Sequence, residues 1–179
     1  NSSDAVDVLD ARPNIPILWA GYAFSWDYTT PRGHMHAIED ITRSLRTGAP
    51  GVGIETQPST CWTCKSPDVP RLMATMGGSA DGNIDAIRKG AAKFYSGKWG
   101  DEAWAAEVAN PIGCWDCHEA ETMNLRISRP ALVEAFERRG MDIKNATQQE
   151  MRTLVCAQCH VEYYFDNRDG KVNYLTFPW

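Results

Sequence analysis

The feature that most constrains this chain is a cysteine pattern that occurs three times. All six cysteines fall into pairs with two residues between them, in the segments CWTCK at 61–65, CWDCH at 114–118 and CAQCH at 156–160. The second and third pairs are followed at once by a histidine, whereas Lys65 follows the first. Disulfide frameworks rarely consist of three such tight pairs, and the two halves of a structural zinc site usually lie closer together. A thioredoxin-like redox site would explain one pair, not three. These readings remain the weaker alternatives.

The histidine after two of the pairs indicates covalently attached haem. C-x-x-C-H is the signature of c-type haem attachment, because two thiols bond to one haem and the adjacent neutral imidazole binds its iron. The pattern therefore predicts three sites. Their residues are Cys61, Cys64 and Lys65; Cys114, Cys117 and His118; and Cys156, Cys159 and His160.

Lys65 changes what is expected of the first site. A lysine amine must lose its proton to bind iron, and its ordinary pKa is about 10.4. Such a ligand is expected where the opposite face of the iron stays open for a small molecule, as in a reductase or an oxidase. The alternative is that Lys65 is a surface lysine. For an anionic substrate, cationic partners would be needed, and Arg32, Arg43 and Arg46 precede the motif.

Two further histidines are candidates for the opposite faces of the irons. Residues 34–46 are expected to form a helix, and side chains two residues apart on a helix point about 200° away from each other. His34 and His36 therefore cannot serve the same iron. From the residues alone, which of them is a ligand stays open, and either could be an ordinary surface side chain.

The rest of the chain predicts a mainly α fold with much irregular chain and haems forming the core. A haem-free chain should then be largely unfolded. Apolar residues 17–26 are expected to pack in the core or on a haem, and residues 66–84 to be mostly irregular. The expected elements are helices at 34–46, 85–97, 101–109 and 129–140, a helix that starts at the Thr147–Glu150 capping box and carries the third motif, and a short β-hairpin near the C-terminus.

Local strings in and around the haem motifs carry a resemblance to a known family. LWAGYAFSWDY, PRGH, LRTGAP and CAQCHVEYYF, together with CWTCK, lie between residues 17 and 179. With them the chain resembles the pentahaem, ammonia-forming cytochrome c nitrite reductases. The resemblance implies a dissimilatory six-electron reduction of nitrite to ammonium at a lysine-ligated haem, fed by bis-histidine relay haems. It also implies five haems c in the complete enzyme, calcium, a periplasmic homodimer, and a membrane-associated quinol-oxidising multihaem cytochrome as the electron donor.

The resemblance also implies roles for individual residues. Lys65 would be the proximal ligand of the catalytic haem, Arg46 the pocket arginine and Tyr163 the active-site tyrosine. Glu162 and the backbone carbonyl of Tyr163 would bind calcium, a hard cation that takes oxygen ligands. His34 would be the distal ligand of the third haem.

The resemblance places His34 opposite His160, and no histidine is then left for the second haem unless His36 serves it. We expect a single multihaem domain over residues 1–179 that is part of a longer polypeptide, with a complete trihaem protein as the alternative. Its segments are a loose lead-in over 1–16, a distal-ligand and pocket-arginine segment over 17–60, and the haem motifs at 61–65, 114–118 and 156–160.

Two other functions stay open. One is a multihaem reductase of the octahaem nitrite, tetrathionate or hydroxylamine type, and the other is a plain electron-transfer cytochrome. The net charge of −5 disfavours nucleic acid as a partner, because binding phosphates favours a basic surface.

Overall fold

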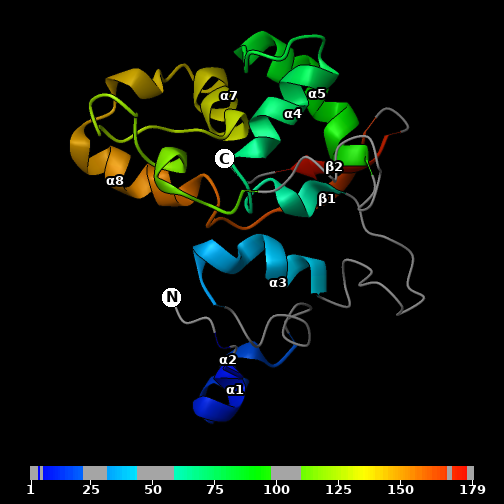
Figure 1. The fold of residues 1–179 in the computed structure, drawn as a ribbon, viewed down its shortest axis with the longest axis vertical. Coiled ribbons are helices and arrows are strands. Elements are labelled where there is room, and N and C mark those ends of the chain that lie inside the picture. Colours follow the sequence, from blue (N-terminus) through cyan, green and yellow to red (C-terminus); the bar gives the residue numbers. More distant parts are fainter. Residues whose placement is uncertain are drawn as a thin grey trace.

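The computed structural model of the chain describes residues 4, 6–21, 32–43, 59–97, 110–168 and 171–176. This part is mainly helical with one short hairpin, which confirms the predicted fold class (Figure 1). In chain order the elements are α1 Val8–Ala11, α2 Ile15–Trp19, the 3-10 helix η1 His34–His36, α3 Ala37–Arg43, η3 Ser59–Trp62, α4 Asp68–Met76, α5 Ile84–Ser96, η4 Cys114–Asp116, α7 Pro130–Arg138, η5 Ile143–Asn145, α8 Gln148–Ala157, and strands β1 Tyr164–Arg168 and β2 Lys171–Thr176.

Helix α4 directly follows the lysine motif, and the expectation of irregular chain over 66–84 is wrong there. The helix starts at Asp68 with Pro67 as its N-cap. Pro70 lies in the first turn, where a missing N–H costs no hydrogen bond because the first four amides of a helix have no partner within it. The prolines therefore start this helix and do not break it.

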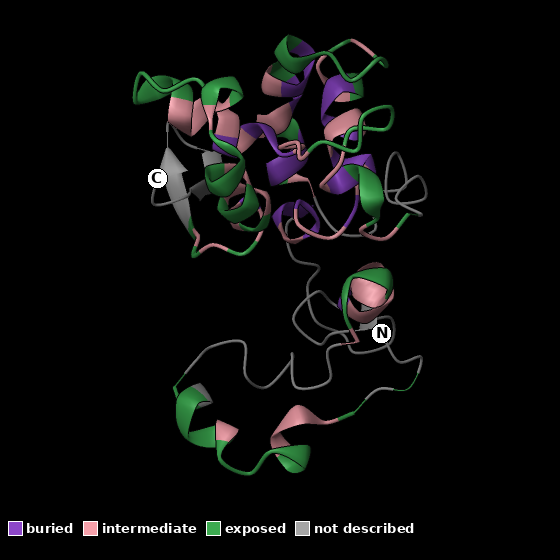
Figure 2. Cartoon of the chain, turned by 90° about the vertical axis from the view of Figure 1, so that its left-hand side faces the viewer, coloured by how far each residue is buried: buried purple, intermediate pink, exposed green. Residues whose placement is uncertain are grey.

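Helices α4 and α5 form the centre of the described fold. A Cβ atom at Gly90 of α5 would lie 1.6 Å from the carbonyl oxygen of Met73 on α4, so the two backbones approach closely because residue 90 has no side chain. Their facing sides are buried, as Figure 2 shows in purple. The buried cluster consists of Trp62, Val69, Leu72, Met73, Ala74, Ala86, Ile87, Phe94 and Tyr95. The protein thus has an apolar core of its own beside the expected haems.

The predicted helices at 85–97 and 129–140 are confirmed as α5 and α7. Gly140 follows α7 with φ +73°, a left-handed conformation that glycine adopts without strain. Arg88 of α5 joins the two helices through ion pairs with Glu134 and Glu137 of α7.

The capping box at the start of α8 is also confirmed. Glu150 N–H donates to Thr147 Oγ1 at 3.3 Å, and Thr147 N–H donates to Glu150 Oε2 at 2.7 Å. The helix then carries Cys156 in its last turn. The predicted hairpin follows as antiparallel β1 and β2, with Tyr164 opposite Thr176; β2 lies beside α5.

The N-terminal part differs from the expectations. The lead-in contains helix α1, which the Asp7 side chain caps by accepting from two backbone amides, and α2, whose first turn holds Pro16. Ile17 and Leu18 are 79% and 82% exposed, so these two do not pack in a core. The helix expected over 34–46 is η1 followed by α3, with residues 44–46 outside the described part. The helix expected at 101–109 also lies outside it.

Candidate haem-attachment and active site

Each cysteine motif lies at a helical segment: η3 and the turn after it hold the first, η4 begins the second, and the end of α8 begins the third. In the two histidine motifs the amide of the final residue donates to the carbonyl of the first cysteine at 2.8 Å, from His118 to Cys114 and from His160 to Cys156. In the lysine motif the Lys65 amide donates instead to Trp62, also at 2.8 Å. The amide of the final residue therefore bonds three residues back in the lysine motif and four residues back in the two histidine motifs.

The imidazoles of His34 and His160 face each other with ring centroids 6.1 Å apart and planes tilted by 55°. Imidazole nitrogens bind metal ions at about 2.1 Å, so two rings on opposite faces of one iron should have centroids roughly 6 Å apart. These two residues fit one iron between them. His36 points elsewhere, with Nδ1 3.5 Å from Glu39 Oε2. Because residues 34–36 form a 3-10 helix, the angle differs from the α-helical one that we expected, but the two rings still diverge.

His118 is oriented by its own loop. Its Nδ1 lies 2.8 Å from the carbonyl oxygen of Met123, so this nitrogen is the N–H donor and Nε2 is free to bind iron. Metal-binding histidines are usually fixed in this way by a second hydrogen bond. The loop presents that carbonyl with Met123 at φ 59°, a strained conformation for a non-glycine residue.

The lysine motif lies against the α4–α5 core. Trp62 and Thr63 are buried. Cys61 and Tyr163, far apart in the sequence, both pack against the same buried cluster. The lysine motif and the active-site tyrosine expected from the resemblance therefore share one support.

The first and third motifs are in direct contact through their cysteines. A hydrogen bond with Cys159, together with the charges of Lys65 and Arg129, lowers the pKa of the Cys64 thiol to about 7. The same hydrogen bond, with burial, raises the pKa of Cys159 far above its usual range. The motifs at 61–65 and 156–160, far apart in the sequence, therefore meet at their second cysteines.

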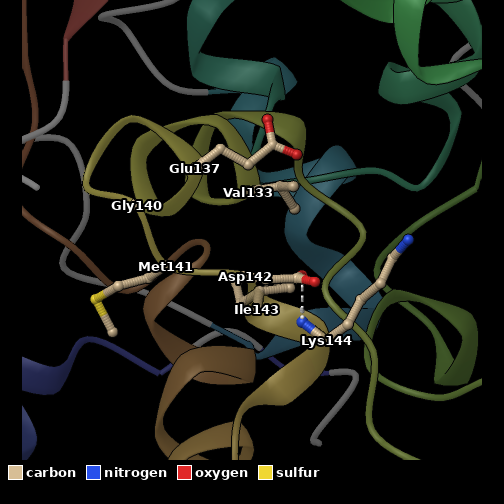
Figure 3. Close-up of a pocket in the computed structure, with 7 residues that line it drawn as sticks. All are labelled: Val133, Glu137, Gly140, Met141, Asp142, Ile143 and Lys144. Atoms are coloured by element: carbon tan, nitrogen blue, oxygen red, sulfur yellow. Dashed lines mark hydrogen bonds between the residues drawn. The ribbon is translucent and has the colours of Figure 1, made fainter.

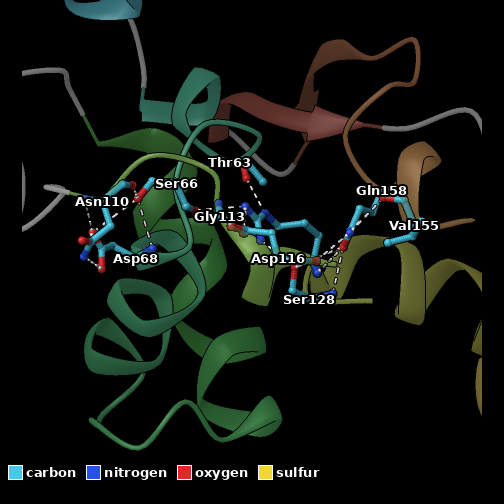
Figure 4. Close-up of polar contacts among 10 residues, drawn as sticks. Thr63, Ser66, Asp68, Asn110, Gly113, Asp116, Ser128, Val155 and Gln158 are labelled. Carbon is cyan, nitrogen blue, oxygen red and sulfur yellow. Dashed lines mark hydrogen bonds and ion pairs between the residues drawn. The ribbon is translucent and has the colours of Figure 1, made fainter. Parts of the chain in front are cut away.

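Sequence reasoning missed a buried arginine that links the motifs. The Arg129 side chain is 1% exposed and forms an ion pair with Asp116, from Nη2 to Oδ1 at 2.7 Å. Its Nε donates to the Thr63 carbonyl at 2.6 Å, Nη2 to the Ser66 carbonyl at 3.1 Å, and Nη1 to Ser128 Oγ at 2.7 Å. One guanidinium thus binds the lysine motif and the second motif together (Figure 4).

Gln158 brings the third motif into the same network. Its Oε1 accepts from the amides of Ser128 and Arg129 at 2.8 and 3.1 Å, and its Nε2 donates to the Asp116 carbonyl at 3.0 Å. Thr63, Asp116 and Gln158 each stand directly before the second cysteine of a motif, and all three are buried. The sequence did contain a signal for this network: a polar residue stands directly before the second cysteine in all three motifs.

The structure describes the three arginines that precede the lysine motif only in part. Arg46 lies outside the described residues, and nothing is described of the Arg43 side chain. Arg32 is wrong as a candidate for binding an anion, because ion pairs with Glu39 and Asp40 at 2.7 and 2.6 Å already engage it.

Glu162 is exposed next to Tyr163. Within the described ranges no group of three or more His, Cys, Asp or Glu side chains could hold a metal ion. The two calcium ligands implied by the resemblance are therefore not joined by further acidic ligands in this part of the structure.

Two surface hollows lie away from the motifs. One of about 330 Å³ lies between α7 and η5, where Val133 and Glu137 face Asp142 and Ile143 (Figure 3). Another of about 560 Å³ lies between η5 and α8 and includes Phe136 and Leu154. Neither is lined by a predicted site residue, so neither is a candidate for the active site.

Comparison with known proteins gives a consistent result. Three curated relatives named cytochrome c-552 match the whole chain: 64% identical in Parabacteroides distasonis and in Bacteroides thetaiotaomicron, and 59% in Porphyromonas gingivalis. The chain covers 33% of each of these proteins, about a third of their length.

In the described part, helices are too short or too polar to cross a bilayer.

A solved structure is also similar. The cytochrome c nitrite reductase catalytic subunit from Desulfovibrio desulfuricans ATCC 27774, which has two calcium sites, superposes with a TM-score of 0.64 and 34% sequence identity. The match covers 90% of this chain and 32% of that subunit. The family model for cytochrome c552 matches residues 1–179. Since the family model matches every residue of the chain, the chain belongs to the cytochrome c552 family.

Proposed function

We propose that this chain forms the lysine-ligated catalytic site of an enzyme that reduces nitrite to ammonium with six electrons. The observation that carries the proposal is the position of the lysine motif. Cys61 and Tyr163 pack on the same buried cluster, and Cys64 contacts the third motif. A site built in this way has a rigid inner wall, an aromatic hydroxyl nearby and a neighbouring redox site.

The haem-binding residues divide into two kinds. Haem c, when bound, supplies a redox-active iron at each motif. His34 and His160 would bind opposite faces of one iron, which saturates it for electron transfer. Lys65 would hold the catalytic iron through a deprotonated amine and leave the opposite face for substrate.

Other residues of this chain would bind and orient the anion. Arg46 would place its positive charge beside the nitrite oxygens, and Tyr163 would donate a hydrogen bond from its hydroxyl. Glu162 and the Tyr163 carbonyl would contribute oxygen ligands to calcium. Calcium at these two adjacent residues would anchor the segment that carries the tyrosine.

The relatives are about three times as long as this chain, so the whole enzyme is part of the proposal. It would carry five haems, form a homodimer in the periplasm, and receive electrons from a membrane-associated quinol-oxidising cytochrome. A multihaem reductase for another substrate, or a plain electron carrier, would have the same attachment turns. Activity towards nitrite is what separates these functions.

The deciding experiment measures ammonium formed from nitrite by the full-length holoenzyme with a reduced dye as donor. Lys65→Ala should lower the rate by roughly a hundredfold or more, since even residues that only support a metal ligand contribute 10- to 100-fold. Lys144→Ala is the matched control, because Lys144 is exposed on η5 and away from the motifs. Wild-type rates from Lys65→Ala, with all haems present, would contradict the proposal.

A further inference from the structure

A buried arginine connects the three cysteine motifs, the first two through its guanidinium and the third through its backbone amide. Arg129 is the extended residue directly before α7. The chain before it forms the loop of the second motif, which an isolated β-bridge between His118 and Leu125 closes. The guanidinium reaches from there to the carbonyls of Thr63 and Ser66, on either side of Lys65. The haem-binding turns of the first and second motifs are thus bonded to the same planar group.

The guanidinium is held by the protein on several sides. Three of its N–H groups donate hydrogen bonds, to the carbonyls of Thr63 and Ser66 and to the Ser128 hydroxyl. Asp116 Oδ1 lies 2.7 Å from Nη2 as an ion pair without a hydrogen bond. The other Asp116 oxygen accepts from the Gly113 amide at 2.8 Å. A fork of this kind fixes both distance and direction, whereas a lysine would supply only a point charge.

The two charges are also shielded from solvent. The side chains of Arg129 and Asp116 are 1% and 4% exposed, so water screens their fields weakly. The guanidinium contacts Thr63, directly before Cys64, and Asp116, directly before Cys117, while the Arg129 amide donates to Gln158, directly before Cys159. Arg129 therefore touches the residue before the second cysteine in each of the three motifs.

We propose that Arg129 is a positioning residue of the haem chain: its guanidinium fixes the first and second motifs relative to one another, its backbone amide joins the third through Gln158, and the Arg129–Asp116 pair sets the reduction potentials of the attached haems. The inference rests on the haem attachment within the proposed function but not on nitrite as substrate. A positive charge nearby favours the reduced iron, which carries one less positive charge, and a negative charge favours the oxidised iron.

The charge component is tested by redox titration of the full-length holoenzyme without substrate. Arg129→Met should lower the midpoint potential of at least one haem, and Asp116→Asn should raise it. We expect about a tenfold change in the ratio of reduced to oxidised haem at fixed potential in each case, in opposite directions, which is about 59 mV for one electron. A purely structural role would not produce opposite signs.

Arg88→Met is the matched control, because Arg88 also joins two helices by ion pairs but contacts none of the motifs. Shifts of the same sign in Arg129→Met and Asp116→Asn, or shifts no larger than in Arg88→Met, would overturn the charge component. If Arg129→Met does not retain its haems, Asp116→Asn decides alone: a raised potential supports the proposal and an unchanged one overturns it.

The positioning component is tested with Arg129→Lys, which keeps the charge but not the fork. Its potentials should stay near those of the wild type, while the magnetic coupling between haems in electron paramagnetic resonance spectra changes. Spectra identical to those of the wild type would overturn this component. Potential shifts as predicted in a protein that makes no ammonium would leave the Arg129 proposal standing and remove nitrite as the substrate.

Discussion

The lysine motif and the second motif share the pattern C-W-x-C and lie in opposite environments. Trp62 is 2% exposed, whereas Trp115 at the same position of the second motif is 66% exposed. The first motif packs against the α4–α5 core, while the second lies on the turn η4 at the surface, where Asp116 holds it. The third motif is intermediate in burial: it lies at the end of α8, and its Cys156 is exposed.

This difference shows what each site depends on. The lysine site is held by the apolar core of the protein, so its geometry can be rigid before a haem is attached. The histidine sites are held by hydrogen bonds of Asp116 and Gln158. Their first cysteines, Cys114 and Cys156, are exposed, and their second cysteines are partly buried. Rigidity is therefore concentrated at the motif that we propose to be catalytic, where precise positioning has the largest effect on rate.

The largest expected effect concerns the histidine pair. His34→Ala should remove one axial ligand from the haem of the third motif and convert that iron from low spin to high spin in the holoenzyme. His36→Ala is the control, because its ring faces Glu39. Electron paramagnetic resonance measures the change as the loss of one low-spin signal. A loss in His36→Ala, and none in His34→Ala, would reverse the assignment.

A smaller effect separates the two tryptophans directly. Trp62→Ala should lower the free energy of unfolding by about 3–5 kcal/mol, as expected for a large buried aromatic side chain. Trp115→Ala should change it by less than about 0.5 kcal/mol, as for an exposed site. Denaturant unfolding of the two holoprotein variants measures both. Equal costs would show that the surface of the second motif is as well covered as that of the first.

The smallest effect concerns the helix that carries the third motif. Thr147→Ala removes the cap of α8 and should cost about 1 kcal/mol, without altering the lysine site. Circular dichroism during denaturation, alongside the spectrum of the lysine-ligated haem, measures the two effects separately. A change at the lysine haem would show that the two regions are coupled more tightly than the comparison suggests.

The same cap has a pH dependence with a defined sign. Hydrogen bonds from Thr147 lower the pKa of Glu150 below its ordinary 4.5. A depressed carboxyl pKa stabilises the fold above the unfolded value, and this contribution is lost as the pH falls through the folded value. Acidification below about pH 4.5 should therefore weaken α8 in the wild type and have less effect in Thr147→Ala. An identical acid response in both would contradict the assignment.

Much of the chemistry was accessible from local patterns. The attachment cysteines, the following His118 and His160, and the capping box of α8 are each defined by residues within one turn of one another. For that reason the capping box and the helix that carries the third motif were predicted correctly. Where local rules competed, prediction was wrong: residues 66–84 were expected to be mostly irregular, although Pro67 and Pro70 stand at the start of α4, where a helix tolerates proline.

By itself the sequence determined that the six thiols stand in three C-x-x-C motifs, which predict haem attachment in a mainly helical chain, and that one motif ends in lysine. Only the tertiary structure decided which turn is buried, that the rings of His34 and His160 meet, and that Arg129 joins Thr63 and Asp116. The physical reason is range: turn geometry depends on adjacent residues, whereas burial and ion pairing depend on segments that come together only when the chain folds.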